Sequence, residues 1–408
     1  MRPACALLLA VLLPGQGAAQ PEVARDPAAW GRAIYQGENG AGLLILIGDR
    51  AVRLPGLSCA GCHGTDAMGG AEAQAGPAIG WPRLAGELGY TVAGLERLLT
   101  EGRRPDGTML GGVMPRFALA PTGGEAEALA AWLGVVGTIQ RTGFLPDRAL
   151  FHLSPEPGLA PFRQAFDQAV AEAAPKGVYG RRIVLTADRP AVATLAAPQP
   201  DPAADRPDFF PLAALIGDED PAAVRGGSAT LAAQVAGVAH GEAGLQLLAK
   251  PEISARLQPL LTGGDSLTFL TRADQADPSV PVFVLGADLL ADLTNRPGTG
   301  RIYAPIDDLA GLPASPAGCV IAVDPRPARW PGPVLARYGR VAGQVLVEAL
   351  RDCGPDCTRA RLMRGLDGLR LEDSDWPPLD YRDHRLTGTA AMRLWQVCDG
   401  EMRAFEGD

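Results

Sequence analysis

Apolar residues recur at helical spacing in three stretches near the start of the chain. The spacing predicts helices over 28–36, over 91–101 and from a capping box at 122–125 to about 137. Asp26 and Pro27 supply an N-cap and a first-turn proline for the first helix. Pro115 disfavours helix, so residues 111–117 are expected to form an extended loop. The first domain is therefore predicted to be all-α.

After a linker at about 137–146, short apolar runs alternate with an amphipathic stretch. A strand at 149–153, a helix at 161–174 and a strand at 180–185 form a β-α-β unit, which predicts a parallel sheet covered by helices. Residues 189–207, rich in Ala, Pro and Asp, are expected to form a loop. Asp399-Gly400 predicts a hairpin turn. The other predicted elements are strands at 266–270, 280–285, 318–323 and 392–397 and a helix at 340–351.

The N-terminus has the pattern of a secretory signal peptide over residues 1–19. Arg2 gives the positive flank, residues 6–13 an apolar core, and residues 17–19 a small-residue cleavage site. The apolar core is too short to span a membrane, and no later run reaches the required ~20 residues. We therefore expect a mature chain without a transmembrane segment, located in the periplasm.

Composition adds two limits. A length of 408 residues suits two or three domains, and a net charge of -9 argues against a nucleic-acid partner. Lys176 and Lys250 are the only lysines, so nearly all cationic side chains are arginines.

The most specific motif is Cys59-Ala60-Gly61-Cys62-His63. Its C-x-x-C-H spacing is that of covalent c-type haem attachment, with two thiols for the haem and an imidazole for the iron. A thioredoxin-type redox pair would need a preceding strand, and a zinc site would need a second ligand pair. The chain has no second C-x-x-C. One covalently attached haem c is therefore predicted.

The second axial ligand is expected to be a methionine. Met114 lies beside Pro115 in the extended loop, where its thioether can turn inward, and a sulfur ligand opposite His63 raises the haem potential. The alternatives are Met109, which lacks the proline neighbour, and Met68, which follows His63 too closely to cross the haem.

Four cysteines remain after the signal peptide and the haem motif: Cys319, Cys353, Cys357 and Cys398. An even number in an oxidising compartment favours two disulfides. A Gly-Pro-Asp turn separates Cys353 from Cys357, so we favour that pair together with Cys319–Cys398. The alternative is that one or more of these thiols stay reduced and buried.

Residues 20–140 resemble a monohaem class I cytochrome c. The helix with Gly31 and Tyr35, the CAGCH motif, the Met-Pro loop and the helix with Trp132 follow that family's order. The resemblance implies that Cys59 and Cys62 hold the haem, that His63 and Met114 bind its iron, and that the first and last helices pack together. It also places Pro77 and Trp81 loosely at the haem edge. Residues 102–107, running into Met114-Pro115, resemble cytochromes that serve periplasmic alcohol dehydrogenases.

Residues 141–408 resemble a shortened type I periplasmic binding protein, the receptor of branched-chain amino-acid ABC transporters. The resemblance is carried by Gly177-Val178-Tyr179-Gly180-Arg181, by 338–350 and 358–366, and by Val397-Cys398-Asp399-Gly400. It implies two α/β lobes around a cleft. The family's ligand-binding residues have no clear counterpart. Ser228 and Thr230 are either remnants of an anion-holding turn or, more simply, a helix start capped by Ser228.

Together these patterns predict a periplasmic electron carrier and no enzymatic activity. A quinoprotein-type alcohol dehydrogenase would donate single electrons, as part of a dehydrogenase system, and a cytochrome or oxidase of the respiratory chain would accept them. The alternative is a solute-binding or sensing protein of ABC-transporter receptor type with an accessory haem. His152, His240 and His384 are isolated in sequence and are interpreted as surface or hydrogen-bonded side chains.

Overall fold

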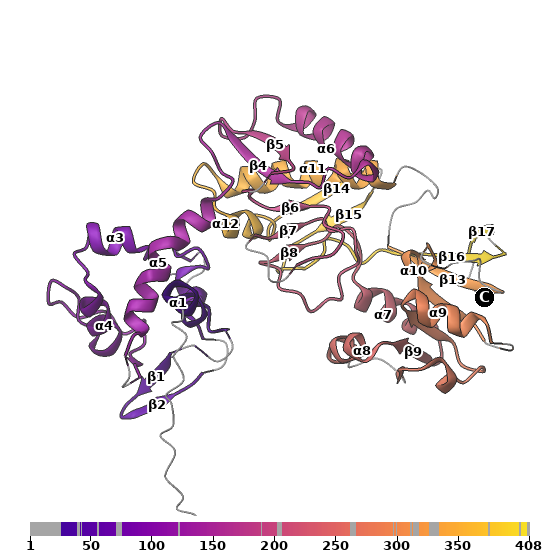
Figure 1. Cartoon of the computed structure of the whole chain (residues 1–408), viewed down its shortest axis with the longest axis horizontal. Helices are drawn as coiled ribbons and strands as arrows, with labels where there is room; N and C mark the ends of the chain where they lie inside the picture. Colours follow the sequence, from indigo (N-terminus) through magenta and orange to yellow (C-terminus); the bar gives the residue numbers. More distant parts are fainter. Residues whose placement is uncertain are drawn as a thin grey trace, which may run out of the picture. The chain divides into compact units, whose positions relative to one another are not determined.

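The structure is a computed structural model that describes residues 26–405 apart from short gaps, and it divides into the units Met1–Val136 and Gly137–Asp408 (Figure 1). The gaps are 39–40, 42, 55–56, 71–75, 121–122, 189, 202–205, 262–266, 297, 299, 311, 313–317, 326–333, 374–375 and 400. The predicted signal peptide at 1–19 lies outside the described residues.

The first unit contains the helices that periodicity predicts. Its helices are α1 (Pro27–Gln36), α2 (Cys59–His63), α3 (Trp81–Gly86), α4 (Val92–Glu101) and α5 (Glu125–Arg141), of which α5 continues past the unit's end. The Asp26 carboxylate accepts the amide of Ala28 at 3.0 Å and caps α1. Thr91 caps α4 by accepting the amide of Gly94 at 3.0 Å. Local capping chemistry therefore sets where both helices begin.

Helices α1 and α5 pack closely because of a glycine. A Cβ atom on Gly31 would overlap the Ala128 carbonyl and lie 2.9 Å from Cβ of Trp132. Tyr35, fully buried four residues later, donates its hydroxyl to the carbonyl of Gly64 at 2.6 Å. This bond ties α1 to the end of α2, the helix that carries the C-x-x-C-H motif.

The prediction of an all-α first domain is wrong. Strands β1 (Leu44–Ile47), β2 (Arg50–Val52) and β3 (Phe117–Ala118) form an antiparallel sheet in the order β2-β1-β3. Leu44–Ile47 is an apolar run ending in a β-branched residue, and Gly48 at φ 60° makes the turn that pairs it with β2. The predicted capping box stays a prediction, because Thr122 lies outside the described residues; Glu125 accepts the amide of Ala120 at 2.8 Å.

The second unit begins with an α/β lobe, here called the first lobe. Its parallel sheet has the order β5-β4-β6-β7-β8. The strands are β4 (Arg148–His152), β5 (Arg182–Thr186), β6 (Thr194–Leu195), β7 (Asp208–Phe209) and β8 (Val224–Arg225). The lobe also holds α6 (Ala160–Ala173), α11 (Val334–Cys353), α12 (Arg359–Arg364) and the hairpin of β14 (Arg370–Asp373) and β15 (Trp376–Asp380).

The second lobe has a seven-stranded sheet in the order β10-β9-β11-β12-β13-β16-β17, parallel up to β13 and antiparallel beyond it. Its strands are β9 (Leu245–Ala249), β10 (Leu267–Leu270), β11 (Val282–Leu285), β12 (Ile302–Pro305), β13 (Cys319–Asp324), β16 (Arg393–Cys398) and β17 (Glu401–Ala404). Its helices are α7 (Leu231–Gly241), α8 (Pro251–Leu257), α9 (Ala287–Thr294) and α10 (Ile306–Ala310). Neighbouring residues of β9 belong to different cores, since Leu247 packs on one face and Leu248 on the other. The α/β class with parallel sheets is confirmed for this unit.

Neither lobe is continuous in sequence. The core of the first lobe draws on residues 149–210 and 338–381, and the cores of the second lobe draw on 216–323 and on Met392, Leu394 and Phe405. The chain therefore leaves the first lobe after β8, builds the second, returns through α11 and leaves again before β16.

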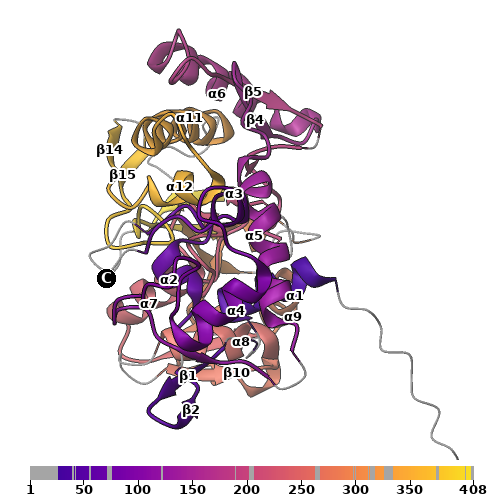
Figure 2. The ribbon, with the colours of Figure 1, turned by 90° about the vertical axis from the view of Figure 1, so that its left-hand side faces the viewer.

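Helices α6 and α11 lie side by side in the first lobe (Figures 1 and 2). Two glycines one turn apart on α11 permit this contact. A Cβ on Gly339 would overlap the Phe162 carbonyl, and a Cβ on Gly343 would lie 3.0 Å from the Phe166 carbonyl. Phe162 and Phe166 are fully buried, so this helix pair organises the core of the lobe.

Both favoured disulfides are present in the structure. Cys319 pairs with Cys398, its direct partner across β13 and β16, and Cys353 pairs with Cys357. Their sequence separations are 79 and 4, so loop-closure entropy gives about 4.5 kcal/mol to the first and about 2 kcal/mol to the second. The first disulfide is therefore expected to contribute more to global stability than the second.

Several boundaries differ from the sequence expectation. Residues 189–207 are not a plain loop, because β6 lies within them. Strands β9 and β12 had no predicted counterpart, since their fully buried apolar residues show no alternation to detect. Within the described part of the chain, no helix combines the length and apolarity that a membrane crossing requires.

The α6–α11 contact gives a direct test. Replacing Gly339 by Ala should lower the free energy of unfolding by about 2 kcal/mol, because the added methyl group has no room. Gly241→Ala is the matched control: it lies at the end of α7 with nothing within 4 Å of its Cβ position, so it should be neutral or slightly stabilising. Urea unfolding measures both, and equal effects would contradict the packing argument.

Candidate functional site

The C-x-x-C-H motif forms its own short helix. Ser58 caps α2 by accepting the amide of Gly61 at 3.2 Å, and the helix carries Cys59 at its start and Cys62 and His63 one turn later. Both thiols are unpaired. Burial raises the pKa of the Cys59 thiol to about 11. This direction is opposite to the lowered pKa of the reactive thiol in redox C-x-x-C sites.

His63 is held with one ring nitrogen occupied. Its Nδ1 lies 2.8 Å from the carbonyl of Pro77, and since a carbonyl only accepts, Nδ1 carries the proton. The lone pair of Nε2 is then left for a metal ion, the tautomer that metal-binding histidines adopt. Gly76 makes room for the ring, because a Cβ there would lie 2.5 Å from Nδ1 of His63. These residues fit a haem with His63 as ligand.

The structure places the candidate methionines differently. Met109 is 57% exposed, whereas Met114 is half-buried in the loop before β3. Met68 follows α2 directly and bonds through its amide to Asp66 at 3.1 Å. Trp81 begins α3 and is half-buried. Met114 thus stays the preferred ligand, and the haem assignments stay predictions. In the described residues, no group of three or more His, Cys, Asp or Glu side chains is arranged to hold a metal ion.

In the second unit, the segment by which the chain leaves the first lobe is held by aromatic side chains. Tyr381 donates its hydroxyl to the Gly226 carbonyl and Trp376 donates its indole N–H to the Gly227 carbonyl, both at 2.9 Å. A Cβ on Gly227 would lie 2.4–2.9 Å from ring atoms of Phe210 and Tyr338, so only glycine fits there. Burial raises the pKa of Tyr338 and the pKa of Tyr381, which keeps both hydroxyl groups protonated as donors.

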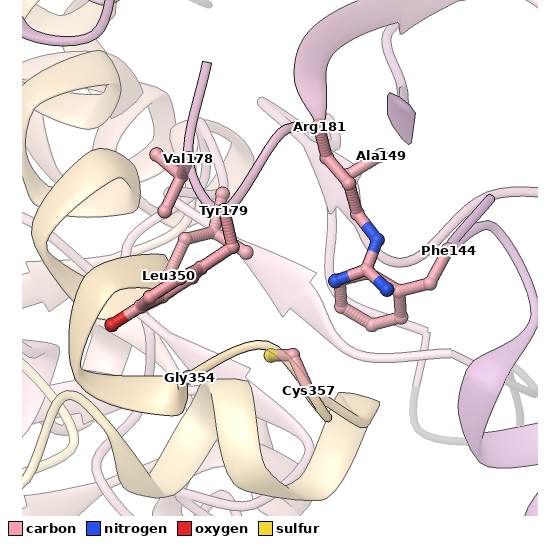
Figure 3. Close-up of a pocket in the computed structure, with 8 residues that line it drawn as sticks. All are labelled: Phe144, Ala149, Val178, Tyr179, Arg181, Leu350, Gly354 and Cys357. Atoms are coloured by element: carbon pink, nitrogen blue, oxygen red, sulfur yellow. The ribbon is translucent and has the colours of Figure 1, made fainter. Parts of the chain in front are cut away.

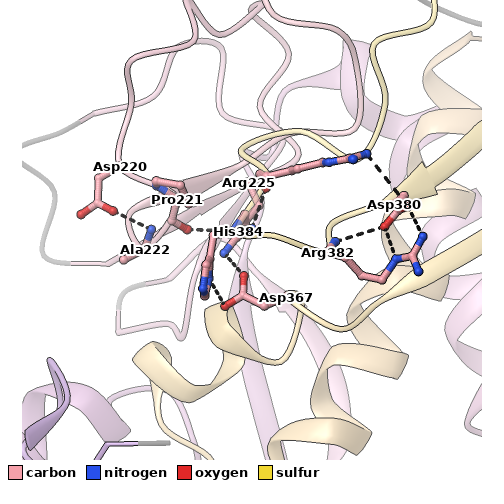
Figure 4. Close-up of polar contacts among 9 residues, drawn as sticks. Asp220, Pro221, Ala222, Arg225, Asp367, Asp380, Arg382 and His384 are labelled. Carbon is pink, nitrogen blue, oxygen red and sulfur yellow. Dashed lines mark hydrogen bonds and ion pairs between the residues drawn. The ribbon is translucent and has the colours of Figure 1, made fainter. Parts of the chain in front are cut away.

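A buried arginine anchors the same segment (Figure 4). Arg225, 3% exposed in its side chain, donates to Asp367 at 2.5 Å and to the carbonyls of Pro221 and Arg385. The second oxygen of Asp367 lies 2.8 Å from Nδ1 of His384. His384 and its neighbour Asp383 both have positive φ, 58° and 63°, which is uncommon for non-glycine residues. The network joins β8 to the loop that leads to β16.

The carboxyl ends of the parallel strands carry charge where the strand order reverses. In the second sheet this point lies between β9 and β11, and Lys250 after β9 forms an ion pair with Asp288 on α9 at 3.0 Å. Asp308 accepts the amide of Gly286 at 2.9 Å, and burial, with the nearby charges of Asp307 and Asp288, raises its pKa. Such switch points are where open α/β sheets bind ligands.

A small hollow, open to solvent, lies near the amino-terminal ends of the strands of the first lobe's sheet (Figure 3). Val178 and Leu350 give it apolar walls. The hydroxyl of Tyr179 donates to the Arg351 carbonyl and Arg181 donates to the Pro355 carbonyl, both at 2.7 Å. These polar groups bond to the protein's own backbone, so the pocket has a structural role beside the Cys353–Cys357 disulfide.

Other sequence candidates resolve as follows. Thr230, not Ser228, caps α7 by accepting the amide of Ala233 at 3.1 Å, so the expected Ser228 cap is wrong. His240 is exposed in the last turn of α7. His384 is hydrogen-bonded, as described above. Lys250, Asp288, Arg225 and Asp367 were missed, because their partners lie far away in sequence.

Comparison with known proteins gives structural neighbours only. No model of a known protein family matches the chain, and no curated protein matches it. A possible leucine/isoleucine/valine-binding protein of Rhodopirellula baltica SH 1 aligns at 14% identity over 64% of this chain and 98% of its own, with a TM-score of 0.44. An extracellular ligand-binding receptor of Verminephrobacter eiseniae aligns at 11% identity over 63% and 99%, with a TM-score of 0.43. An ABC transporter substrate-binding protein of Sphaerobacter thermophilus aligns at 14% identity over 64% and 96%, with a TM-score of 0.43.

These neighbours are binding proteins and receptors, and none of them is described as a cytochrome. They contradict the expectation that the chain is a cytochrome c that carries electrons from a quinoprotein dehydrogenase to the respiratory chain. The expected redox donor and acceptor proteins have no support among these neighbours either.

The role of the buried ion pair between Arg225 and Asp367 can be tested by mutation. Asp367→Asn should lower the free energy of unfolding by about 3 kcal/mol, because it leaves the Arg225 charge buried without a counter-charge. Asp380→Asn is the control: Asp380 pairs with the exposed Arg382 in the same region, and its loss should have little effect. Chemical denaturation compares the two, and an equally small loss for both would contradict the role given to Asp367.

Proposed function

We propose that the chain is a periplasmic solute-binding or sensing protein of the ABC-transporter receptor type, with an accessory haem in its first unit. The observation that carries this proposal is the interrupted connectivity of the second unit. Two α/β lobes with separate cores are joined where the chain leaves after β8, returns at α11 and leaves again before β16. Lobes connected in this way can hinge around a bound ligand.

The second sheet supports a ligand site at the carboxyl ends of its strands. Lys250 and Asp288 lie at the switch point of the second sheet and offer one cation and one anion within 3.0 Å of each other. A solute with a carboxylate or an amino group can replace one partner of this exposed pair at little cost, since exposed ion pairs contribute little stability. We therefore place the solute's charged end at Lys250 and Asp288.

The segment by which the chain leaves the first lobe gives the connection between the lobes a defined geometry. Tyr381 and Trp376 hold the carbonyls of Gly226 and Gly227, and Arg225 ties the same strand to Asp367. A hinge needs a few residues that change their backbone angles between fixed ends. We assign this role to residues between Gly227 and Thr230, where α7 starts.

The accessory haem rests on the fit of four residues. Cys59 and Cys62 would attach it, His63 would bind its iron through Nε2, and Met114 would be the second iron ligand from the protein. When bound, the haem iron supplies a group whose redox state can change. In a receptor, it would report that state rather than carry electrons between enzymes. Covalent haem attachment is consistent with a periplasmic location.

Solute binding is tested by thermal shift and calorimetry on the full chain with branched-chain amino acids, short carboxylates, alcohols and aldehydes. At about 100 times its Kd, a true ligand adds about 2.7 kcal/mol to the free energy of unfolding. Lys250→Gln should weaken its binding about tenfold. Lys176→Gln, which changes the other lysine of the chain, is the control and should leave binding unchanged. Silence from the whole panel would reject the receptor assignment for these solute classes.

Haem attachment is tested by expressing the chain with a c-type haem maturation system. The denatured wild type should keep the haem, seen as added mass and as haem staining on a denaturing gel, because thioether bonds survive unfolding. Cys59→Ser with Cys62→Ser should abolish it. Cys353→Ser with Cys357→Ser, which removes a different cysteine pair, should not. A haem-free denatured wild type would sink this part of the proposal.

A further inference from the structure

The loop between α4 and β3 is closed on itself by backbone bonds. The amide of Arg104 donates to the Thr108 carbonyl at 2.9 Å, and the amide of Leu110 donates to the Gly102 carbonyl at 2.7 Å. Arg103 and Met109 form a β-bridge between them. The loop therefore forms a small hairpin, and Met114 lies in the segment that connects this hairpin to β3.

Arg116 joins this hairpin to Met114. Its Nη1 donates to the Met114 carbonyl at 3.0 Å and its Nη2 donates to the Leu110 carbonyl at 3.2 Å. The two acceptors lie on opposite sides of the turn at 111–113, so one planar guanidinium spans the base of that turn. The rigid fork of arginine suits this task, whereas lysine presents only a single nitrogen.

Gly102 holds the guanidinium in place. This residue ends α4 with φ 72°, and a Cβ atom there would overlap the Arg116 guanidinium. The guanidinium thus rests directly on the backbone at the end of α4. Among the described residues Arg116 forms no ion pair, so its charge is committed to backbone carbonyls.

We infer that Arg116 is a positioning residue that presents the Met114 thioether to the haem iron; this inference rests on the haem part of the proposed function. Its bond fixes the Met114 carbonyl, and Pro115 fixes φ at the next residue. The backbone of the methionine is thereby constrained on its carboxyl side. The amino-terminal neighbours cannot do this, because Val113 is 80% exposed and the loop there has two glycines.

The test is the ferric spectrum and the midpoint potential of the haem-loaded full chain. Arg116→Ala should lose the weak near-infrared sulfur–iron band and lower the midpoint potential, matching Met114→Ala, because a thioether ligand raises the potential. Arg116→Lys should give an intermediate result. Gly102→Ala, which keeps every side chain of the loop but crowds the guanidinium, should also weaken the band. It keeps the test informative if Arg116→Ala folds poorly.

Arg103→Ala is the matched control, since Arg103 lies on the same hairpin, is exposed and pairs only loosely with Glu101 at 3.8 Å. It should keep both the band and the potential. Survival of the band and potential in Arg116→Ala with its haem attached would overturn the role of Arg116 alone. A wild type that holds haem without the band would overturn Met114 as ligand and Arg116 with it. A wild type without covalent haem would overturn the haem assignment itself, and the role of Arg116 with it.

Discussion

The structure of the second unit depends on hydrogen-bond donors for two buried carbonyl oxygens, those of Gly226 and Gly227. A buried carbonyl without a donor costs about 1–3 kcal/mol, and the neighbouring chain cannot supply donors where a strand ends and the chain departs for another lobe. Tyr381 and Trp376 supply them from 155 and 149 residues away. The segment by which the chain leaves the first lobe therefore depends for its stability on the second half of that lobe.

In the first unit, the corresponding hydrogen bonds join residues that are close in sequence. Ser58 caps the helix of the haem motif, Pro77 orients His63 from 14 residues away, and Arg116 reaches back only six residues to Leu110. The described contacts that would prepare the proposed haem site lie between Tyr35 and Arg116. This difference explains why the C-x-x-C-H motif can be recognised in the sequence and the proposed solute site cannot.

Sequence patterns located α1, α4, β4, α6 and β5, where periodicity and capping residues act within one turn or strand. They failed where burial on both faces removes periodicity, as in β9, and where strands are two residues long, as in β6. They also predicted no strands for the β1–β2 hairpin, although an apolar run followed by Gly48-Asp49 is a hairpin pattern. The Arg225–Asp367 pair spans 142 residues and has no local signature at all.

The relative size of the two units bears on which function the chain serves. Moving an electron through a haem requires only a unit such as the first, which ends at Val136. Residues 137–408 build three further cores, a disulfide across a sheet and a buried ion pair. This structure holds the two lobes in a defined arrangement. Such an arrangement is useful for binding a ligand at the carboxyl ends of the strands. Under the proposed function, a haem in the first unit is an accessory, since solute recognition would depend on the larger unit.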